Sequence, residues 1–137
     1  MLELKVKKLS PHAIVPRRAT DGSAGYDLYA PLDMVKFRGI GIVNTGIAIE
    51  IPDGYVGLVL PRSRISKAGV HTHTGVIDSD YRGSIGVRFT DSCEYTFDPG
   101  DRIAQLLVVP CMMVPVVEVD ELSETARGTG GFGSTGR

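Results

Sequence analysis

The feature that most constrains this chain is the period of its hydrophobic residues, which is two along most of its length. Near the N-terminus, apolar and charged side chains alternate from Leu2 to Lys7. A period of two places successive side chains on opposite faces of a β-strand. Further strands are predicted at residues 40–43, 45–51, 55–60, 75–77, 85–90, 102–109 and 114–119.

Turn-forming residues separate the predicted strands, at residues 52–54 (PDG), 82–83 (RG) and 98–100 (DPG). One short helix is predicted at residues 63–68, with Ser63 as its N-cap and Gly69 ending it in a left-handed conformation. Many short strands with almost no helix are typical of a sandwich, jelly roll or barrel. The sequence therefore predicts an all-β, jelly-roll-like sandwich or barrel with one short helix.

The chain is long enough for one domain and carries no strong charge. Its 137 residues include 15 Lys and Arg and 16 Asp and Glu, which gives a net charge of −1. Stable nucleic-acid binding is not expected, because a protein with that main task is normally basic. No apolar run is long enough to span a membrane. Cys93 and Cys111 are expected to be free thiols in a reducing compartment, so the expected location is cytoplasmic.

Residues 127–137 (RGTGGFGSTGR) differ from the rest of the chain. The simplest interpretation of such a glycine-rich terminus is disorder. The segment nevertheless carries a cation at Arg127 and an aromatic ring at Phe132, and glycine lets backbone N–H groups approach phosphates closely. We therefore predict a domain at residues 1–126, followed by a flexible glycine-rich arm at 127–137 that closes over a nucleotide.

Residues 61–64 (PRSR) follow an apolar strand and place a hydroxyl and backbone N–H groups at the start of the predicted helix. A helix start favours an anion, and Arg62 and Arg64 add positive charge. Taken alone the segment is a weak indication of a phosphate site, because Ser63 is equally well explained as a helix cap.

Residues 75–83 (GVIDSDYRG) predict a β-hairpin with carboxylates near its tip. Asp78 directly follows two apolar residues, so it lies where a strand leaves the core and could act as a general base on a water molecule. Spacing alone favours the alternative, in which Asp78 and Asp80 form the turn by bonding to their own backbone.

Three more side chains could orient charge or hold a metal. Asp27 is a lone acidic residue in an apolar strand, where a structural ion pair is commoner than contact with a metal through water. His71 and His73 would share one face of a strand, but a zinc site needs at least one more protein ligand. We expect the two histidines to line or flank the hairpin.

Five segments of the chain, in this order, resemble the trimeric dUTP pyrophosphatases (dUTPases). They are residues 24–30 (AGYDLYA), 61–63 (PRS), 75–83 (GVIDSDYRG), 100–107 (GDRIAQLL) and 127–136 (RGTGGFGSTG). The third and fifth segments are specific to this family, whereas the first two alone would be weak.

The resemblance implies a jelly-roll subunit, a homotrimer and three active sites at subunit interfaces. In such a trimer one subunit supplies the segments around Asp27, Ser63 and Gln105. A second subunit supplies the hairpin around Asp78, and the third supplies its C-terminal arm. The implied reaction is hydrolysis of dUTP to dUMP and pyrophosphate with Mg²⁺ as cofactor. It limits uracil incorporation into DNA and supplies dUMP for dTMP synthesis.

The same resemblance implies roles for individual residues. Asp78 deprotonates the water that attacks the α-phosphorus, Tyr81 packs against the deoxyribose and excludes a 2′-hydroxyl, and Phe132 stacks over uracil. Asp27 contacts the metal at most indirectly, through water. The residues expected near the base are Thr72, Gly75, Val76, Ile77 and Gly86. The residues expected to hold or cover the phosphates are Arg62, Ser63, Arg64, Gln105, Arg127, Gly133 and Ser134.

The chain departs from the family pattern after Ser63, where a small residue is common and this chain has Arg64. An additional arginine there could tighten the binding of substrate or product, or it could point into an interface. Ile65 and Ser66 likewise stand where a Leu-Ala or Leu-Gly pair is usual.

Three other interpretations compete with hydrolysis of dUTP. A dCTP deaminase shares the fold and the Arg-Ser segment but needs a catalytic glutamate near the base, whereas this chain has the 75–83 segment and a full arm. A regulatory protein could use nucleotide-dependent closure of the arm to control a protein partner, and this role could coexist with catalysis. An inactive β-sandwich with a disordered tail requires all five matching segments to be accidental.

Overall fold

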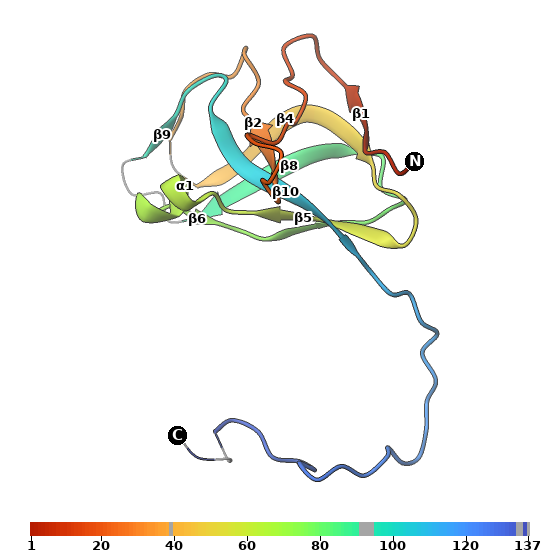
Figure 1. The fold of residues 1–137 in the computed structure, drawn as a ribbon. Helices are drawn as coiled ribbons and strands as arrows, with labels where there is room; N and C mark the ends of the chain where they lie inside the picture. The colour runs from red at the N-terminus through yellow and green to blue at the C-terminus, as the bar shows by residue number, and fades with distance from the viewer. Residues whose placement is uncertain (39, 91–94, 134–135, 137) are drawn as a thin grey trace.

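Two four-stranded antiparallel sheets form the body of the protein in the computed structural model, which describes residues 1–38, 40–90, 95–133 and 136 (Figure 1). The strands of the first sheet, in spatial order, are β1 (Lys5–Lys8), β4 (Gly41–Glu50), β8 (Ser84–Thr90) and β6 (His71–Thr72). Those of the second sheet are β2 (Tyr26–Tyr29), β10 (Arg102–Pro110), β5 (Tyr55–Leu60) and β7 (Gly75–Ile77). The remaining elements are the paired strands β3 (Phe37–Arg38) and β9 (Thr96–Phe97) and the helix α1 (Ser63–Lys67).

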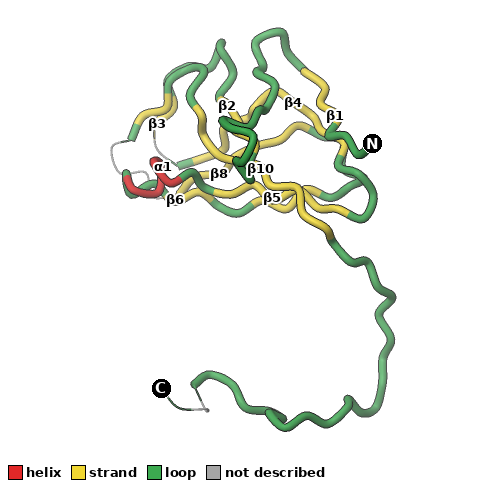
Figure 2. The backbone as a smooth tube through the Cα atoms, viewed as in Figure 1, coloured by secondary structure: helices red, strands yellow, loops and turns green. Residues whose placement is uncertain are grey.

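The core lies between the two sheets, because both contribute an apolar inward face. In β8 the side chains of Ile85, Val87 and Phe89 are buried, whereas Gly86 and Arg88 between them are exposed. The second sheet buries Leu28, Val59, Ile77, Ile103 and Leu106 in the same cluster. The predicted all-β, jelly-roll-like fold is confirmed, and Figure 2 shows how little of the backbone is helical.

The runs predicted as separate strands at residues 40–43 and 45–51 form one ten-residue strand, β4. Its pairing with β8 shifts in register between Asn44 and Ala48. Gly46 has φ +74° there, and its N–H donates to Asn44 Oδ1 at 2.8 Å. The irregularity lets one strand carry a polar interruption while Val43 and Ile47 both stay in the core.

The helix was predicted with the wrong N-cap. Ser63 is its first helical residue, and Arg62, in an extended conformation, is the cap residue without a side-chain cap hydrogen bond. The predicted end is close, because Ala68 is the C-cap and Gly69 has φ +79°. This is the one helix among the described residues, and it is far too short and too polar to cross a membrane.

The prediction of a hairpin at residues 75–83 is wrong, because the strands on either side of the turn do not pair with each other. Strand β7 pairs with β5 in the second sheet, whereas β8 pairs with β4 and β6 in the first. The residues between Ile77 and Ser84 therefore cross from one sheet to the other. The sequence reads as a hairpin because both patterns place a turn between two apolar strands.

The strand predicted at residues 114–119 is absent. After β10 the chain leaves the body as an extended segment that carries the C-terminus away from both sheets (Figure 1). Its apolar side chains are largely exposed, with Val116 98% and Val117 74% accessible. A strand needs a neighbour to bond with, and the segment pairs with no strand among the described residues of its own chain.

Candidate functional site

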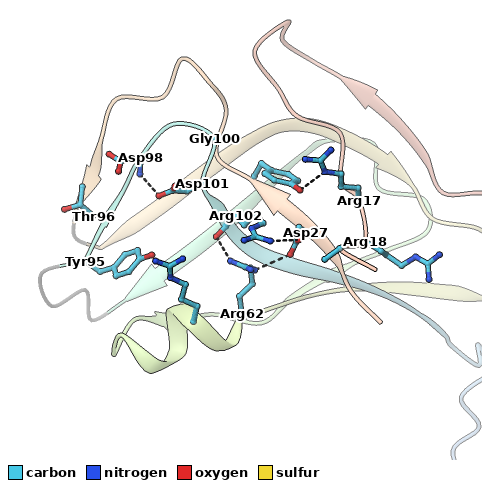
Figure 3. Close-up of a pocket in the computed structure, with 13 residues that line it drawn as sticks. Arg17, Arg18, Asp27, Arg62, Tyr95, Thr96, Asp98, Gly100, Asp101 and Arg102 are labelled. Carbon is cyan, nitrogen blue, oxygen red and sulfur yellow. Dashed lines mark hydrogen bonds and ion pairs between the residues drawn. The ribbon is translucent and has the colours of Figure 1, made fainter. Parts of the chain in front are cut away.

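Asp27 in β2 is the acidic centre of a cluster that joins three parts of the chain. Its side chain is mostly buried, and its Oδ1 lies 3.2 Å from Arg62 Nε, just before α1. Its Oδ2 lies 3.7 Å from Arg102 Nη1 at the start of β10. Figure 3 shows both guanidinium groups directed at this carboxylate. Asp27 thus forms an ion pair that holds two arginines in place, as the commoner of the two predictions expected.

Gln105 in β10 fixes the turn that leads into the helix. Its Nε2 donates to the Pro61 carbonyl at 2.9 Å, and its backbone is paired with Asp27 and Leu60. A Cβ atom at position 25 would lie 2.3 Å from Gln105 Oε1, so a larger residue there would displace the Gln105 side chain. The structure therefore brings together the segments at residues 24–30, 61–63 and 100–107.

A cavity of about 980 Å³ opens over this cluster (Figure 3). Five arginines and three aspartates line it: Arg17, Arg18, Arg62, Arg64, Arg102, Asp27, Asp98 and Asp101. Asp98 is also paired with Lys36, at 3.3 Å. The excess of guanidinium groups over carboxylates suits a ligand with several anionic oxygens, because arginine binds phosphate with paired N–H donors.

Arg17, Arg18 and Arg102 were missed as individual site residues in the sequence. The backbone N–H of Asp27 donates to the Arg17 carbonyl at 2.8 Å, which brings the Arg17-Arg18 pair beside the cluster. The pKa of Arg17 is raised above its ordinary value, mainly by its hydrogen bond to the Tyr29 hydroxyl and by electrostatic interaction with Tyr29. The available signal was two adjacent arginines upstream of residues 24–30.

A second cavity, of about 510 Å³, contains two of the residues predicted to contact a base, Gly75 and Gly86. Thr72 does not line it. The Thr72 side chain is buried and borders a separate cavity of about 310 Å³ beside α1, and its Oγ1 has no hydrogen-bond partner among the described residues. Ile77 is buried in the core and Val76 is exposed.

The crossing segment between β7 and β8 presents Asp78 and Tyr81 to solvent. Its turn is held by the backbone, through Tyr81 N–H to the Asp78 carbonyl at 3.1 Å, and by Arg82, which donates to the Ser79 carbonyl at 2.6 Å. Within the described part of the chain, no side-chain hydrogen bond from Asp78 or Asp80 supports the turn. The structure therefore does not bear out the interpretation of these carboxylates as turn formers.

Of the arm at residues 127–137, the structure describes residues 127–133 and 136, whose hydrogen bonds are local, such as Arg127 Nε to the Gly130 carbonyl at 2.7 Å. The Phe132 ring is fully exposed and its φ is +53°. Gly133, with φ +82°, is exposed beside it. Ser134 lies outside the described residues. Arg127, Phe132 and Gly133 therefore line none of the three cavities described above.

Comparison with known proteins identifies the family of this chain. The dUTPase family model matches residues 11–136. The chain belongs to the dUTPase family. The deoxyuridine 5′-triphosphate nucleotidohydrolase of Arabidopsis thaliana is 46% identical over 136 residues, covering 96% of this chain and 82% of the plant protein.

Two solved dUTPase structures resemble the fold closely. A point mutant of the Staphylococcus bacteriophage 80alpha dUTPase with dUpNHpp has a TM-score of 0.91 and 30% identity, with both chains fully covered. A point mutant of the dUTPase from phage phi11 of S. aureus, described with a structural Mg(II) ion, has a TM-score of 0.79 and 27% identity. That match covers 88% of this chain and 98% of the phage chain.

The predicted site residues of this dUTPase fall into three groups that do not meet within one chain. The first group surrounds Asp27 and contains Arg62, Arg64 and Gln105, next to Ser63. The second group lies on the strands and turn that contain Gly75, Asp78, Tyr81 and Gly86. The third group is the arm. Within the described residues, neither the cavity over Asp27 nor the cavity at Gly75 and Gly86 is lined by residues of another group.

Proposed function

We propose that this dUTPase acts as a homotrimer with Mg²⁺, in which each active site takes one of these three groups from each subunit. The chain hydrolyses dUTP to dUMP and pyrophosphate, as a member of this family. The observation that carries the proposed assembly is the separation of the three groups within one chain. Symmetric closure of identical chains is the usual way in which such a shared site is completed.

The extended segment after β10 supports an assembly of several chains. It exposes a run of apolar side chains that a monomer in water would bury: Met112, Met113, Val114, Val116, Val117, Val119 and Leu122. Contiguous exposed apolar surface of this kind is typical of a protein–protein interface. We infer that the segment packs against a neighbouring copy and carries the arm to that copy's site.

The cluster around Asp27 is the proposed triphosphate site. Arg62 and Arg102 are held in position by Asp27, so their remaining N–H donors are directed before a ligand arrives. Ser63 and Arg64 lie in the first turn of α1, Gln105 lies in β10, and these three residues complete the proposed set. Fixed donors of this kind stabilise the charge that develops on phosphoryl oxygens during hydrolysis.

The proposed general base is Asp78, which takes a proton from the water that attacks the α-phosphorus. An exposed carboxylate on a turn held by backbone contacts is free to meet a substrate that lies on a neighbouring subunit. Tyr81 is proposed to pack against the deoxyribose, and the strands containing Gly75–Ile77 and Gly86 are proposed to receive the base. The arm, through Arg127, Phe132, Gly133 and Ser134, is proposed to cover the nucleotide and exclude water.

The residues of the chain fit a magnesium ion that is carried by the triphosphate. No three His, Cys, Asp or Glu side chains form a metal site within the described ranges, and both Asp27 oxygens already face arginines. Asp27 would therefore contact the ion through water. Mg²⁺ commonly keeps its waters and binds substrate phosphates. When bound, it neutralises charge on the phosphoryl oxygens.

Pyrophosphate release from dUTP, dCTP, dTTP and UTP, measured in parallel with Mg²⁺ and with a chelator, tests this function. We expect rapid release from dUTP alone, and its loss with the chelator. Sedimentation is expected to give three times the 14.7 kDa mass of one chain. Equal release from all four nucleotides, or a monomeric active species, would contradict the proposal.

Exchange of Gly83 for alanine is expected to relax selection against UTP. A Cβ atom at position 83 would lie 2.3 Å from Tyr81 Oη and 2.5 Å from Cζ, so the ring must move. The bond from Tyr81 Oη to the Ser84 carbonyl, at 3.0 Å, would also be lost. We expect the ratio of kcat/KM for dUTP over UTP to fall about tenfold.

The matched control is Gly22→Ala, because a Cβ atom at position 22 would meet nothing within 4 Å. Its ratio should equal that of the wild type. An unchanged ratio in Gly83→Ala, with the protein still folded by circular dichroism, would show that the position of the Tyr81 ring does not decide between dUTP and UTP.

A further inference from the structure

The cavity that contains Gly75 and Gly86 has side-chain walls to which no role has been given. It lies on the outer face of the first sheet, and its other lining residues are Ile42, Asn44, His73, Thr74, Ser84 and Arg88. Gly86 leaves the space open, because a Cβ atom there would lie 2.8 Å from Ile42 Cγ2. Ile42 is 54% exposed and forms an apolar side of the cavity.

Three neighbouring strands place Ile42, Arg88 and His73 next to one another. Ile42 and Arg88 are register partners of β4 and β8. The backbone N–H of His73 donates to the Arg88 carbonyl at 2.9 Å, just beyond β6. The lining of the cavity therefore changes from an apolar side chain to two side chains that carry N–H donors.

The polar groups left free for a ligand in this cavity are mainly donors. Asn44 Oδ1 is already used, since it accepts from Gly46 N–H and from the Ser84 hydroxyl. Arg88 has donors only, and no carboxylate in the described part of the chain lies within 4.0 Å of it. His73 Nε2 is 3.1 Å from Thr90 Oγ1, which leaves Nδ1 for other contacts.

We propose that Arg88 and His73 are specificity-determining residues that select a pyrimidine with a carbonyl oxygen at position 4 over one with an amino group. The inference rests on the proposed function, in which this cavity receives the base. Uracil O4 accepts a hydrogen bond from either residue. The 4-amino group of cytosine would place donors against the Arg88 donors and leave these groups unpaired, which strongly disfavours binding. Ile42 packs against the ring.

Two variants that keep side-chain bulk but remove donors test the proposal, Arg88→Met and His73→Phe. Binding of dUMP and dCMP to the full-length protein is measured by calorimetry, and kcat/KM is measured for dUTP and dCTP. We expect each variant to weaken dUMP binding about tenfold and to lower the preference for dUTP over dCTP about tenfold, with kcat for dUTP nearly unchanged.

Arg88→Lys and His71→Phe are the matched controls. Lysine keeps a charged donor, so Arg88→Lys should retain most of the preference that Arg88→Met loses. The His71 ring lies 5.2 Å from that of His73 but does not line the cavity, so His71→Phe should leave the preference at the wild-type value.

An unchanged preference in both Arg88→Met and His73→Phe overturns the proposal, as does equal binding of dUMP and dCMP by the wild-type protein. The proposed function fails differently, by the absence of pyrophosphate release from dUTP in the wild-type protein. The binding measurements still decide the role of Arg88 and His73 in that case.

Discussion

Replacement of Asp78 with asparagine is expected to lower kcat for dUTP about 10³-fold, within the range of about 10²–10⁴ that a general base contributes. The asparagine side chain has nearly the same shape but cannot take a proton from water. The turn should persist, because the Tyr81 N–H bonds to the backbone carbonyl of residue 78 and not to its side chain. The loss should therefore affect turnover and leave the folded assembly intact.

Three measurements separate these effects for Asp78→Asn. Steady-state kinetics give kcat, calorimetry with dUpNHpp gives binding, and sedimentation gives the mass of the assembly. Asp80→Asn is the control, since Asp80 is an exposed carboxylate on the same turn and should keep kcat within about twofold of the wild type. A variant at Asp78 that turns over at a comparable rate would remove this residue from the role of base.

Deletion of residues 127–137 is expected to lower kcat/KM for dUTP about 10²–10³-fold, because the proposed cover excludes water and supplies contacts to the nucleotide. The fold should tolerate the deletion. The hydrogen bonds of the arm's described residues are local, such as Gly128 N–H to the Thr125 carbonyl at 3.2 Å, and the side chain of Phe132 is fully exposed. The thermal midpoint and the assembly mass should therefore match those of the full chain.

The control for the deletion is a chain that keeps the arm but exchanges Gly131 for alanine, where a Cβ atom would meet nothing within 4 Å. Phe132→Ala then isolates the contribution of the ring, and a smaller loss is expected than for the deletion. Normal turnover by the truncated protein would show that the arm does not cover the site.

The strands that could be predicted from the sequence are those whose alternation is bounded by turns on both sides. Strand β5 was predicted with its observed limits, and β8 and β10 each differ by one residue at one end. Strand β4 was divided in two, because the bulge at Gly46 interrupts a pattern that tertiary pairing then restores. The strand at residues 114–119 failed because local alternation cannot reveal whether a pairing partner exists in the same chain.

The candidate site could be predicted in parts. The motif around Asp27 and the segment at residues 61–63 were expected to cooperate, and the ion pair between Asp27 and Arg62 joins them. Arg17 and Arg18 were missed because backbone pairing with β2, which no local pattern encodes, brings them to the cavity. The hairpin prediction failed for a similar reason, since the partners of β7 and β8 lie far away in sequence.

The separation of the three residue groups within one chain has a genetic consequence. In the proposed trimer, the general base Asp78 and the arm at any one site come from different polypeptides. An equal mixture of chains lacking Asp78 with chains lacking the arm would then form about one site in four with both parts intact, if the chains assemble at random. Two alleles that are each inactive would complement one another in the same cell, and one defective allele would impair sites built partly from normal chains.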